Sequence, residues 1–392
     1  MSAVARSDLR LAGLNLDPVM LTLTAALVGL GMVIVLSASI AVADRELGQP
    51  FYYLWRHGGA LLVGLLAAGF CLAVPTGLWF RLSGVLLLLG LALLALVLVP
   101  GVGHSVNGAT RWLKLGIVNL QVSELARLAI MVYISGYVVR HQAELSVRFL
   151  GLVKPMAVVV IAIGLLIAEP DYGAAVVLAA TCLGVLFVGG ANLRGFVVVV
   201  VAALAALALL AVSAQYRVQR LTTFMDPWAD PFDGGFQLTQ SLIAIGRGEL
   251  LGVGLGGSVQ KLFYLPEAHT DFVFAVLGEE FGFLGVALTL LLFAWLIWRI
   301  VQLAVSATSA GLFFQGYLAF SIGLWLALQT LINMGVNTGM LPTKGLTLPL
   351  LSYGRTSVVV TLAAIGMLLR IHHEVGVATA RRGPRRRREA PP

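Results

Sequence analysis

The stretch with the clearest potential for chemistry is residues 266–271, which read Pro-Glu-Ala-His-Thr-Asp. It closes a long polar segment, after which the chain becomes apolar again at Phe272. Asp271, with His269 two residues before it, is a candidate general base, a group that takes a proton from an attacking hydroxyl. The alternative is structural, because Thr270 and Asp271 can open a helix, whose first amides and dipole favour an ionised carboxylate.

A second cluster could contact an anionic group. Arg111 and Lys114 are candidates for binding a phosphate headgroup, since a guanidinium grips phosphate oxygens bidentately. Glu124 and Arg127 follow at i, i+3 spacing on one helix face, where they can form a structural ion pair. Ionisable groups within membrane spans are costly and usually face a cavity, so lining a cavity is the competing interpretation.

Two further clusters interrupt the apolar sequence. Residues 169–171, Glu-Pro-Asp, predict an acidic turn between two helices. The turn is either solvated, or it lines a cavity or contacts a cation. Residues 337–357 contain prolines and glycines that forbid a continuous helix. Irregular backbone survives within a membrane only where protein buries it or where it lines a cavity. Lys344 and Arg355 could meet phosphate there.

The composition places these clusters in a membrane protein. Of the 392 residues, 59% are hydrophobic and 11% are charged, whereas a soluble domain has roughly 25% charged residues. The apolar blocks are long enough for helices that cross about 30 Å of hydrocarbon, where backbone groups must be satisfied internally. The sequence therefore predicts an all-α polytopic membrane protein with about ten transmembrane helices. The expected spans are residues 18–42, 57–75, 81–100, 121–140, 154–168, 172–190, 195–212, 279–302, 311–335 and 355–372.

A long extracytoplasmic loop, about residues 213–278, is expected between the seventh and eighth spans. Loops of this length are usually functional. Within it, residues 236–246 predict an amphipathic helix on the membrane surface. Residues 252–257 match the GxGxxG pattern, but no strand precedes them and no βαβ unit surrounds them. A flexible loop that permits close backbone approach is expected there instead of a dinucleotide site.

The distribution of Lys and Arg predicts that both termini are cytoplasmic. With the N-terminus inside, most of the 26 basic residues fall in inner segments, in agreement with the positive-inside rule. Residues 1–17 then form a cytoplasmic N-terminus, residues 18–372 the membrane domain and residues 373–392 a basic cytoplasmic tail.

In this orientation, carboxylates, hydroxyls and cations converge on the outer leaflet. The outer loop adds Arg217, Lys261 and His269 to the candidate substrate-binding residues. A substrate that combines a lipid tail, a pyrophosphate and a nucleophilic hydroxyl would satisfy all of these groups. Such a substrate is a lipid-linked sugar.

Five stretches resemble the signatures of the SEDS family (shape, elongation, division and sporulation). The longest are GVGLGGSVQKLFYLPEAHTDFVFAVLGEEFG (252–282) and NTGMLPTKGLTLPLLSYGRTS (337–357), and the others are residues 107–116, 121–129 and 169–175. The matches run from the first span to the last. The runs SVQKLFYLPEAHTD and LPTKGLTLP favour the division branch of the family over its elongation branch.

The resemblance implies a ten-span peptidoglycan glycosyltransferase of the bacterial inner membrane that polymerises lipid II at the division septum. It implies that Asp271 is the family's essential carboxylate. The substrate cavity is expected to be lined by Arg111, Lys114, Glu124, Lys344, Ser352 and Tyr353. Expected partners are lipid II, the growing glycan strand, a class B penicillin-binding protein that crosslinks the strands, and other division membrane proteins. No nucleic-acid partner is expected.

One position departs from the family pattern. The family usually has Gly-Gly where this chain has Gly354-Arg355. A second glycine would permit a positive φ, which arginine tolerates poorly. Either Arg355 does not adopt such a conformation, or the loop is reshaped.

The expected reaction is an inverting transfer in which Asp271 deprotonates the acceptor 4-hydroxyl and polyprenyl pyrophosphate leaves. A divalent cation, Mg²⁺ or Mn²⁺, could help to stabilise the leaving group. The sequence has no dedicated metal cage, so such an ion would bind through Asp271 and substrate phosphate. Two other classes stay open: a lipid II flippase, which needs alternating access but no base, and a non-catalytic scaffold that activates the class B partner.

Overall fold

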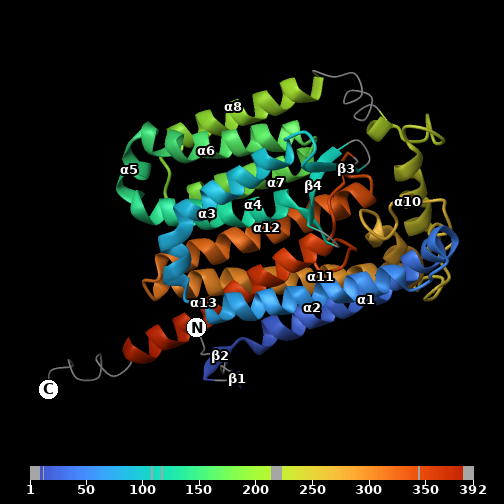
Figure 1. The fold of residues 1–392 in the computed structure, drawn as a ribbon, viewed down its shortest axis with the longest axis horizontal. Helices are drawn as coiled ribbons and strands as arrows, with labels where there is room; N and C mark the ends of the chain where they lie inside the picture. The colour runs from blue at the N-terminus through green and yellow to red at the C-terminus, as the bar shows by residue number, and fades with distance from the viewer. Residues whose placement is uncertain are drawn as a thin grey trace.

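The computed structural model is a bundle of helices that run roughly along one direction (Figure 1). The structure describes residues 9–11, 13–106, 109–115, 118–212, 223–342 and 345–382. Within these residues, eight helices are long and apolar enough to cross a membrane, and two further apolar helices are shorter. The predicted polytopic α-helical fold is thereby confirmed.

The eight long helices are α1 (Pro18–Leu47), α2 (Tyr52–Ala73), α3 (Thr76–Val97), α4 (Val122–Arg140), α6 (Phe149–Ala168), α11 (Val273–Ser309), α12 (Phe313–Asn337) and α13 (Arg355–Arg382). The two shorter ones are α7 (Tyr172–Val188) and α8 (Leu193–Val212). The C-terminal α13 packs along α2, α11 packs along both α12 and α1, and α3 packs along α4. Helices far apart in the sequence are therefore neighbours in the bundle.

α6 begins earlier than the predicted start at residue 154, although Pro155 lies inside it. A proline within a helix leaves the carbonyl four residues before it without its usual donor. The hydroxyl of Tyr137, in α4, donates to that carbonyl, on Gly151, at 2.8 Å. The neighbouring helix replaces the missing bond, so the helix continues through the proline.

Both α11 and α13 exceed their predicted spans. α11 begins at Val273 rather than near residue 279, and α13 continues to Arg382 rather than ending near residue 372. Beyond the predicted end of α13, Glu374 accepts a hydrogen bond from the Thr76 amide at the start of α3, at 3.0 Å. This contact secures the extension, so the predicted tail begins as helix. Residues 383–392 lie outside the described residues.

The glycine-rich loop, residues 252–257, approaches a kink in α11. The kink is at Gly282, whose φ of 63° is in the left-handed region that favours glycine. The Gly254 amide donates to the Glu280 carbonyl at 3.0 Å. A Cβ added to Gly252 would lie 2.2 Å from the same carbonyl oxygen. These glycines therefore serve close approach of backbone to backbone, as the sequence predicted.

Two small antiparallel sheets were not predicted. One consists of β1 (Leu9–Leu11) and β2 (Leu14–Leu16), and the other has the order β3 (Gly103–Val106), β4 (Ala109–Leu115), β5 (Val118–Gln121). The second sheet connects α3 to α4. The Asn107-Gly108 pair in that sequence is a strong hairpin signal, and it lies between two long apolar blocks.

The two ends of the bundle carry different elements (Figure 1). α10 (Phe236–Arg247) lies at one end together with β3 and β4, and it is the helix predicted for residues 236–246. The opposite end carries α5 (Gln142–Val147), β1, β2 and the C-terminal end of α13. The first and last described elements therefore lie on the same side of the bundle, opposite α10.

Candidate active site

Asp271 lies on a tight turn that leads into α11. The Glu267 carbonyl accepts hydrogen bonds from the amides of Thr270, Asp271 and Phe272, at 3.1, 3.1 and 3.2 Å. The N-cap residue of α11 is Phe272, and no side-chain hydrogen bond caps the helix. The helix-cap alternative for Asp271 is therefore not what the structure shows.

Apolar packing against neighbouring helices holds the turn in place. Leu265, Ala268 and Phe272 are buried in a small cluster with residues of α1, α10, α11 and α12. On the other side, a Cβ added to Gly345 would lie only 2.8 Å from Asp271 Oδ2. The loop after α12 therefore approaches the carboxylate closely, and a side chain at position 345 would displace the carboxylate.

The surroundings of Asp271 suit a base that works near neutral pH. Burial raises the pKa of the Asp271 carboxyl to about 7, and the negative charges of Glu267 and Asp171 push this pKa in the same direction. The positive charge of Arg111 opposes them and lowers this pKa. A catalytic base is most effective when its pKa lies near the working pH.

Arg111 reaches the acidic turn between α6 and α7 from strand β4. Its Nη1 lies 3.7 Å from Asp171 Oδ1. Its Nε donates to the Glu169 carbonyl at 3.2 Å, and Nη2 donates to the Pro170 carbonyl. Lys114, three residues later on the same strand, is exposed, and it makes no hydrogen bond or ion pair with the described residues of the acidic turn. The structure therefore brings Arg111, but not Lys114, to the acidic residues.

The acidic turn is buried rather than solvated. Glu169 is 0% exposed and Asp171 is 2% exposed. Asp171 accepts hydrogen bonds from Ser123 Oγ at 3.1 Å and from the Ala174 amide at 3.3 Å. Burial, reinforced by Asp171, raises the pKa of Glu169 to about 8, while Arg111 opposes this shift. Of the two interpretations of this turn, lining the interior is the one that agrees with the structure.

His269 and Tyr353 meet beside the Asp271 turn. The Tyr353 amide donates to the His269 carbonyl at 2.9 Å, and the ring centroids lie 5.5 Å apart. Tyr53, in α2, packs on both, at 4.7 and 5.2 Å. Burial lowers the pKa of His269, so its imidazole is held towards the neutral form. Ser352 is buried, and its hydroxyl accepts a hydrogen bond from the Leu348 amide at 2.8 Å, which stabilises a turn.

Two predicted substrate-binding residues are engaged elsewhere. Lys261 is buried, and its Nζ lies 2.6 Å from Glu280 Oε1 and 2.7 Å from Ser37 Oγ. Glu124 forms the predicted ion pair with Arg127 at 3.3 Å, and both are buried within the bundle. In both cases the charge is paired with an oppositely charged residue inside the protein.

Two more predicted residues, Arg217 and Lys344, lie outside the described residues. The departure at Arg355 is resolved, because Arg355 is the first residue of α13 and does not have a positive φ. No reshaped loop is needed to accommodate its side chain.

The sequence interpretation missed two asparagines of α12. The side-chain amides of Asn333 and Asn337 donate to the Asp271 carbonyl at 2.9 and 3.0 Å. Their signal in the sequence is a pair of asparagines four apart in a largely apolar span, where polar side chains usually bond to neighbouring elements.

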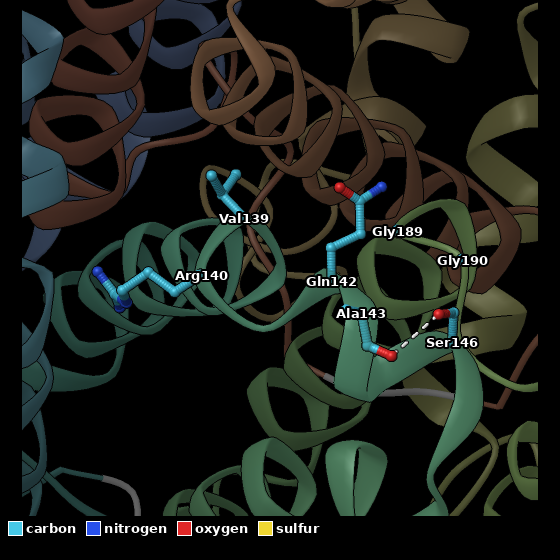
Figure 2. Close-up of a pocket in the computed structure, with 7 residues that line it drawn as sticks. All are labelled: Val139, Arg140, Gln142, Ala143, Ser146, Gly189 and Gly190. Atoms are coloured by element: carbon cyan, nitrogen blue, oxygen red, sulfur yellow. Dashed lines mark hydrogen bonds between the residues drawn. The ribbon is translucent and has the colours of Figure 1, made fainter.

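A pocket of about 580 Å³ lies at the other end of the bundle, beside α5 (Figure 2). It is lined by Val139, Arg140, Gln142, Ala143, Ser146, Gly189 and Gly190. Arg140 donates instead to the Phe80 carbonyl and the Ser83 hydroxyl, and Ser146 donates back to the Ala143 carbonyl. The polar side chains of this pocket do not converge on a ligand, so it is not the candidate site.

Within the described ranges, no three His, Cys, Asp or Glu side chains are grouped so that they could hold a metal ion. The Asp271 carboxylate is a hard oxygen ligand of the kind that Mg²⁺ accepts. Asp171 is near enough for its charge to act on Asp271. Asp171 is already engaged by Arg111 and Ser123, so an ion held by Asp271 would take its remaining ligands from substrate phosphates and water.

The fold and the site together define a class: polytopic helical membrane proteins with a partly buried carboxylate and a guanidinium at one end of the bundle. The profile of the FtsW, RodA and SpoVE family, described as cell cycle protein, matches residues 18–376. The protein named "Probable peptidoglycan glycosyltransferase FtsW" of Thioalkalivibrio sulfidiphilus is 52% identical over 361 residues, which cover 92% of this chain and 89% of that protein. The chain therefore belongs to the FtsW, RodA and SpoVE family, the SEDS family that its motifs indicated.

Solved structures agree with this assignment. A chain from the structure described as "Structural coordination of polymerization and crosslinking by a peptidoglycan synthase complex" superposes with a TM-score of 0.75 at 31% identity, covering 92% of this chain and 98% of that one. The rod shape determining protein RodA of Thermus thermophilus superposes with a TM-score of 0.68 at 31% identity, covering 92% and 97%. Identity to the FtsW relative is higher than to RodA, in agreement with the predicted resemblance to the division branch.

Proposed function

We propose that the protein is a peptidoglycan glycosyltransferase that polymerises lipid II into glycan strands at the division septum, with Asp271 as the general base. The observation that carries this proposal is the Asp271 carboxylate itself. It lies on a rigid turn, burial raises its pKa to about 7, and Arg111 is close enough to act on it electrostatically. The FtsW relative, half identical over nearly the whole chain, supports the same reaction class.

The reaction we propose is a single inverting displacement. Asp271 takes the proton of the acceptor 4-hydroxyl as that oxygen attacks the anomeric carbon of the donor sugar. The bond from the anomeric carbon to the pyrophosphate oxygen breaks, and polyprenyl pyrophosphate leaves with the electron pair. Asp271 then returns its proton to water. No covalent enzyme intermediate is needed, because one base and a good leaving group suffice.

Arg111 is the described cation best placed to bind the pyrophosphate. Its side chain is 24% exposed, so it can contact substrate while it remains held by Asp171 and the turn carbonyls. A guanidinium preorganised in this way stabilises negative charge as it develops on the leaving group. Lys114, Arg217 and Lys344 remain candidates for the same role.

A divalent cation, Mg²⁺ or Mn²⁺, would add to this stabilisation. We propose that the Asp271 carboxylate would hold it, and that the ion would help to neutralise charge on the departing pyrophosphate.

We propose that the protein works with a class B penicillin-binding protein and other division proteins in the inner membrane. The structural relative comes from a peptidoglycan synthase complex that coordinates polymerisation and crosslinking, which supports a crosslinking partner. Both termini are proposed to be cytoplasmic, so that the α10 end faces outward, where the growing glycan strand is found.

The test is a lipid II polymerisation assay of the purified protein with its cognate class B partner, with and without divalent cations. Asp271→Asn should abolish glycan synthesis while the protein still folds and binds the partner. Asp226→Asn, an exposed aspartate of the same outer segment, is the matched control and should keep full activity. A folded Asp271→Asn protein that polymerises lipid II at the normal rate would falsify the catalytic assignment.

The same assay separates the two alternatives. A flippase moves lipid II across the membrane but forms no glycan from lipid II that is already on the outer side. A scaffold that only activates the transpeptidase would tolerate Asp271 substitutions and would instead be sensitive to substitutions on the lipid-facing surface of one span. Glycan product that depends on Asp271 excludes both.

A further inference from the structure

The backbone carbonyl of Asp271 is bound by two side chains of α12. Asn333 Nδ2 donates to it at 2.9 Å, and Asn337 Nδ2 donates to it at 3.0 Å. Residues four apart in a helix lie on the same face, and a carbonyl oxygen has two lone pairs with which to accept both bonds. Asn333 is 2% exposed and Asn337 is 0% exposed, so water does not compete for these bonds.

Asn333 also holds the loop beside the carboxylate. Its Nδ2 donates to the Leu346 carbonyl at 2.6 Å. Gly345, immediately before Leu346, is the residue whose added Cβ would lie 2.8 Å from Asp271 Oδ2. The Asn333 amide therefore bonds both to the backbone of Asp271 and to the loop that the Asp271 carboxylate faces.

Asn337 connects the same carbonyl to two helices. Its Oδ1 accepts a hydrogen bond from the Ala275 amide in the first turn of α11, at 3.1 Å. Its own carbonyl accepts a hydrogen bond from Ser241 Oγ of α10, at 2.8 Å. Asn337, a residue of α12, therefore links the Asp271 turn to α10 and α11 by hydrogen bonds.

We propose that Asn333 and Asn337 are positioning residues for glycosyl transfer, which hold the Asp271 carboxylate in its working place between the loop after α12 and the start of α11. The proposal rests on the proposed function of Asp271. Both asparagines bind the main-chain carbonyl of Asp271, so they act through that residue and do not contact the reacting atoms. A misplacement of about 1 Å can cost about 100-fold in rate.

This role predicts a particular kinetic signature. Arg111, the proposed pyrophosphate contact, is held by β4 and the acidic turn and not by α12. Loss of an asparagine amide should therefore lower kcat with little effect on the KM for lipid II. A residue that only stabilised the bundle would change the amount of folded protein, and not the turnover of each folded molecule.

The first experiment measures kcat and KM for lipid II polymerisation by the full-length protein with its class B partner. Asn337→Leu and Asn333→Leu should lower kcat about 10- to 100-fold and leave KM within about twofold. Asn337→Ala removes the same amide donor without adding the bulk of leucine. It should show the same loss, and it serves if the leucine variants fold poorly.

Two variants of α12 are matched controls. Thr330→Val removes a buried hydroxyl that has no hydrogen-bond partner, and it should keep the wild-type kcat. Leu326→Ala opens a cavity in the large apolar core, away from the Asp271 turn, and should lower thermal stability but not kcat per folded molecule. The proposal is overturned if the asparagine variants keep kcat within twofold. It is also overturned if Leu326→Ala loses as much kcat at the same loss of thermal stability.

A second experiment needs no activity. The two native cysteines, Cys71 and Cys182, are buried, so Asp271→Cys introduces a single reactive thiol. Its rate of modification by a small thiol reagent should differ several-fold between the wild-type and Asn337→Leu backgrounds, and should be unchanged by Leu326→Ala. Equal rates in the first two backgrounds overturn the positioning role. Failure of the proposed function is recognised separately, by equal polymerisation rates of the wild type and Asp271→Asn.

Discussion

At the scale of single residues, the charge state of Asp271 is set by its neighbours. Burial is the largest influence and raises the pKa of this carboxyl to about 7, followed by the negative charge of Glu267. Glu267 also forms the turn itself, because its carbonyl accepts three consecutive amides. Glu267 therefore both shapes the turn and helps to raise the pKa of Asp271 towards neutral pH.

The pH dependence of polymerisation follows from this arrangement. A general base works only when it is deprotonated, so kcat should fall about tenfold per pH unit below the Asp271 pKa and level off above it. Glu267→Gln removes a negative charge that raises this pKa, so the acidic limb of the profile should move to lower pH. The measurement is kcat against pH for the wild type and the variant.

Glu249→Gln is the control for this profile. Glu249 is an exposed carboxylate of the same outer segment, and its backbone carbonyl accepts a hydrogen bond from the Phe283 amide. Its substitution should leave the acidic limb in place. An unchanged limb in Glu267→Gln would show that this charge does not act on the base.

At the scale of elements, two buried glutamates at the kink of α11 hold the outer loop. Glu279 accepts hydrogen bonds from Arg247 Nη1 at 2.7 Å and from Ser258 Oγ at 2.5 Å. Glu280 pairs with Lys261, whose side chain is 5% exposed. The stretch that carries Asp271 is thereby anchored to α11 on both sides of the glycine-rich loop.

Lys261 is therefore predicted to act in stability. Removing one member of a buried ion pair leaves an uncompensated charge, which costs roughly 3–5 kcal/mol. Lys261→Met should lower the free energy of unfolding by about this amount, measured by denaturant unfolding in detergent. The double variant Lys261→Met/Glu280→Met should recover most of the loss, because an apolar pair of similar volume is tolerated.

A different outcome would restore the original prediction for Lys261. If Lys261→Met is as stable as the wild type and instead raises the KM for lipid II, the lysine binds substrate.

At the scale of the whole molecule, the orientation in the membrane determines whether the site can meet substrate. α10 lies at one end of the bundle and α5 at the other (Figure 1). The positive-inside rule assigns the α5 end to the cytoplasm. The Asp271 turn then lies on the outer side, where the proposed polymerisation would take place.

Two single-cysteine variants test this orientation in right-side-out membrane vesicles. Phe232, in the outer segment, is 89% exposed, and Val147, in α5, is 73% exposed. A membrane-impermeant thiol reagent should label Phe232→Cys at once and Val147→Cys only after the vesicles are permeabilised. The wild type, with both cysteines buried, is the unlabelled control. The reverse pattern would invert the proposed topology.

The membrane spans could be predicted from the sequence because hydrocarbon imposes a local requirement. Each span needs a run of apolar residues whose backbone bonds close within the helix. Two helices depart from their predicted bounds because a residue of a neighbouring helix supplies a hydrogen-bond partner. α6 passes through Pro155 because Tyr137 of α4 supplies a donor, and α13 extends because Glu374 meets Thr76 of α3.

Asp271 itself could also be singled out from the sequence, through its motif and its place at the end of a polar segment. The partners of each polar residue could not, because they come from distant parts of the chain. Arg111 meets Asp171, Lys261 meets Glu280, and Asn333 meets Asp271. Apolar runs determine which segments form spans, whereas the relative placement of helices and strands decides which buried charges and amides meet. The sequence alone therefore determined the bundle and its candidate base, and the tertiary structure decided what surrounds that base.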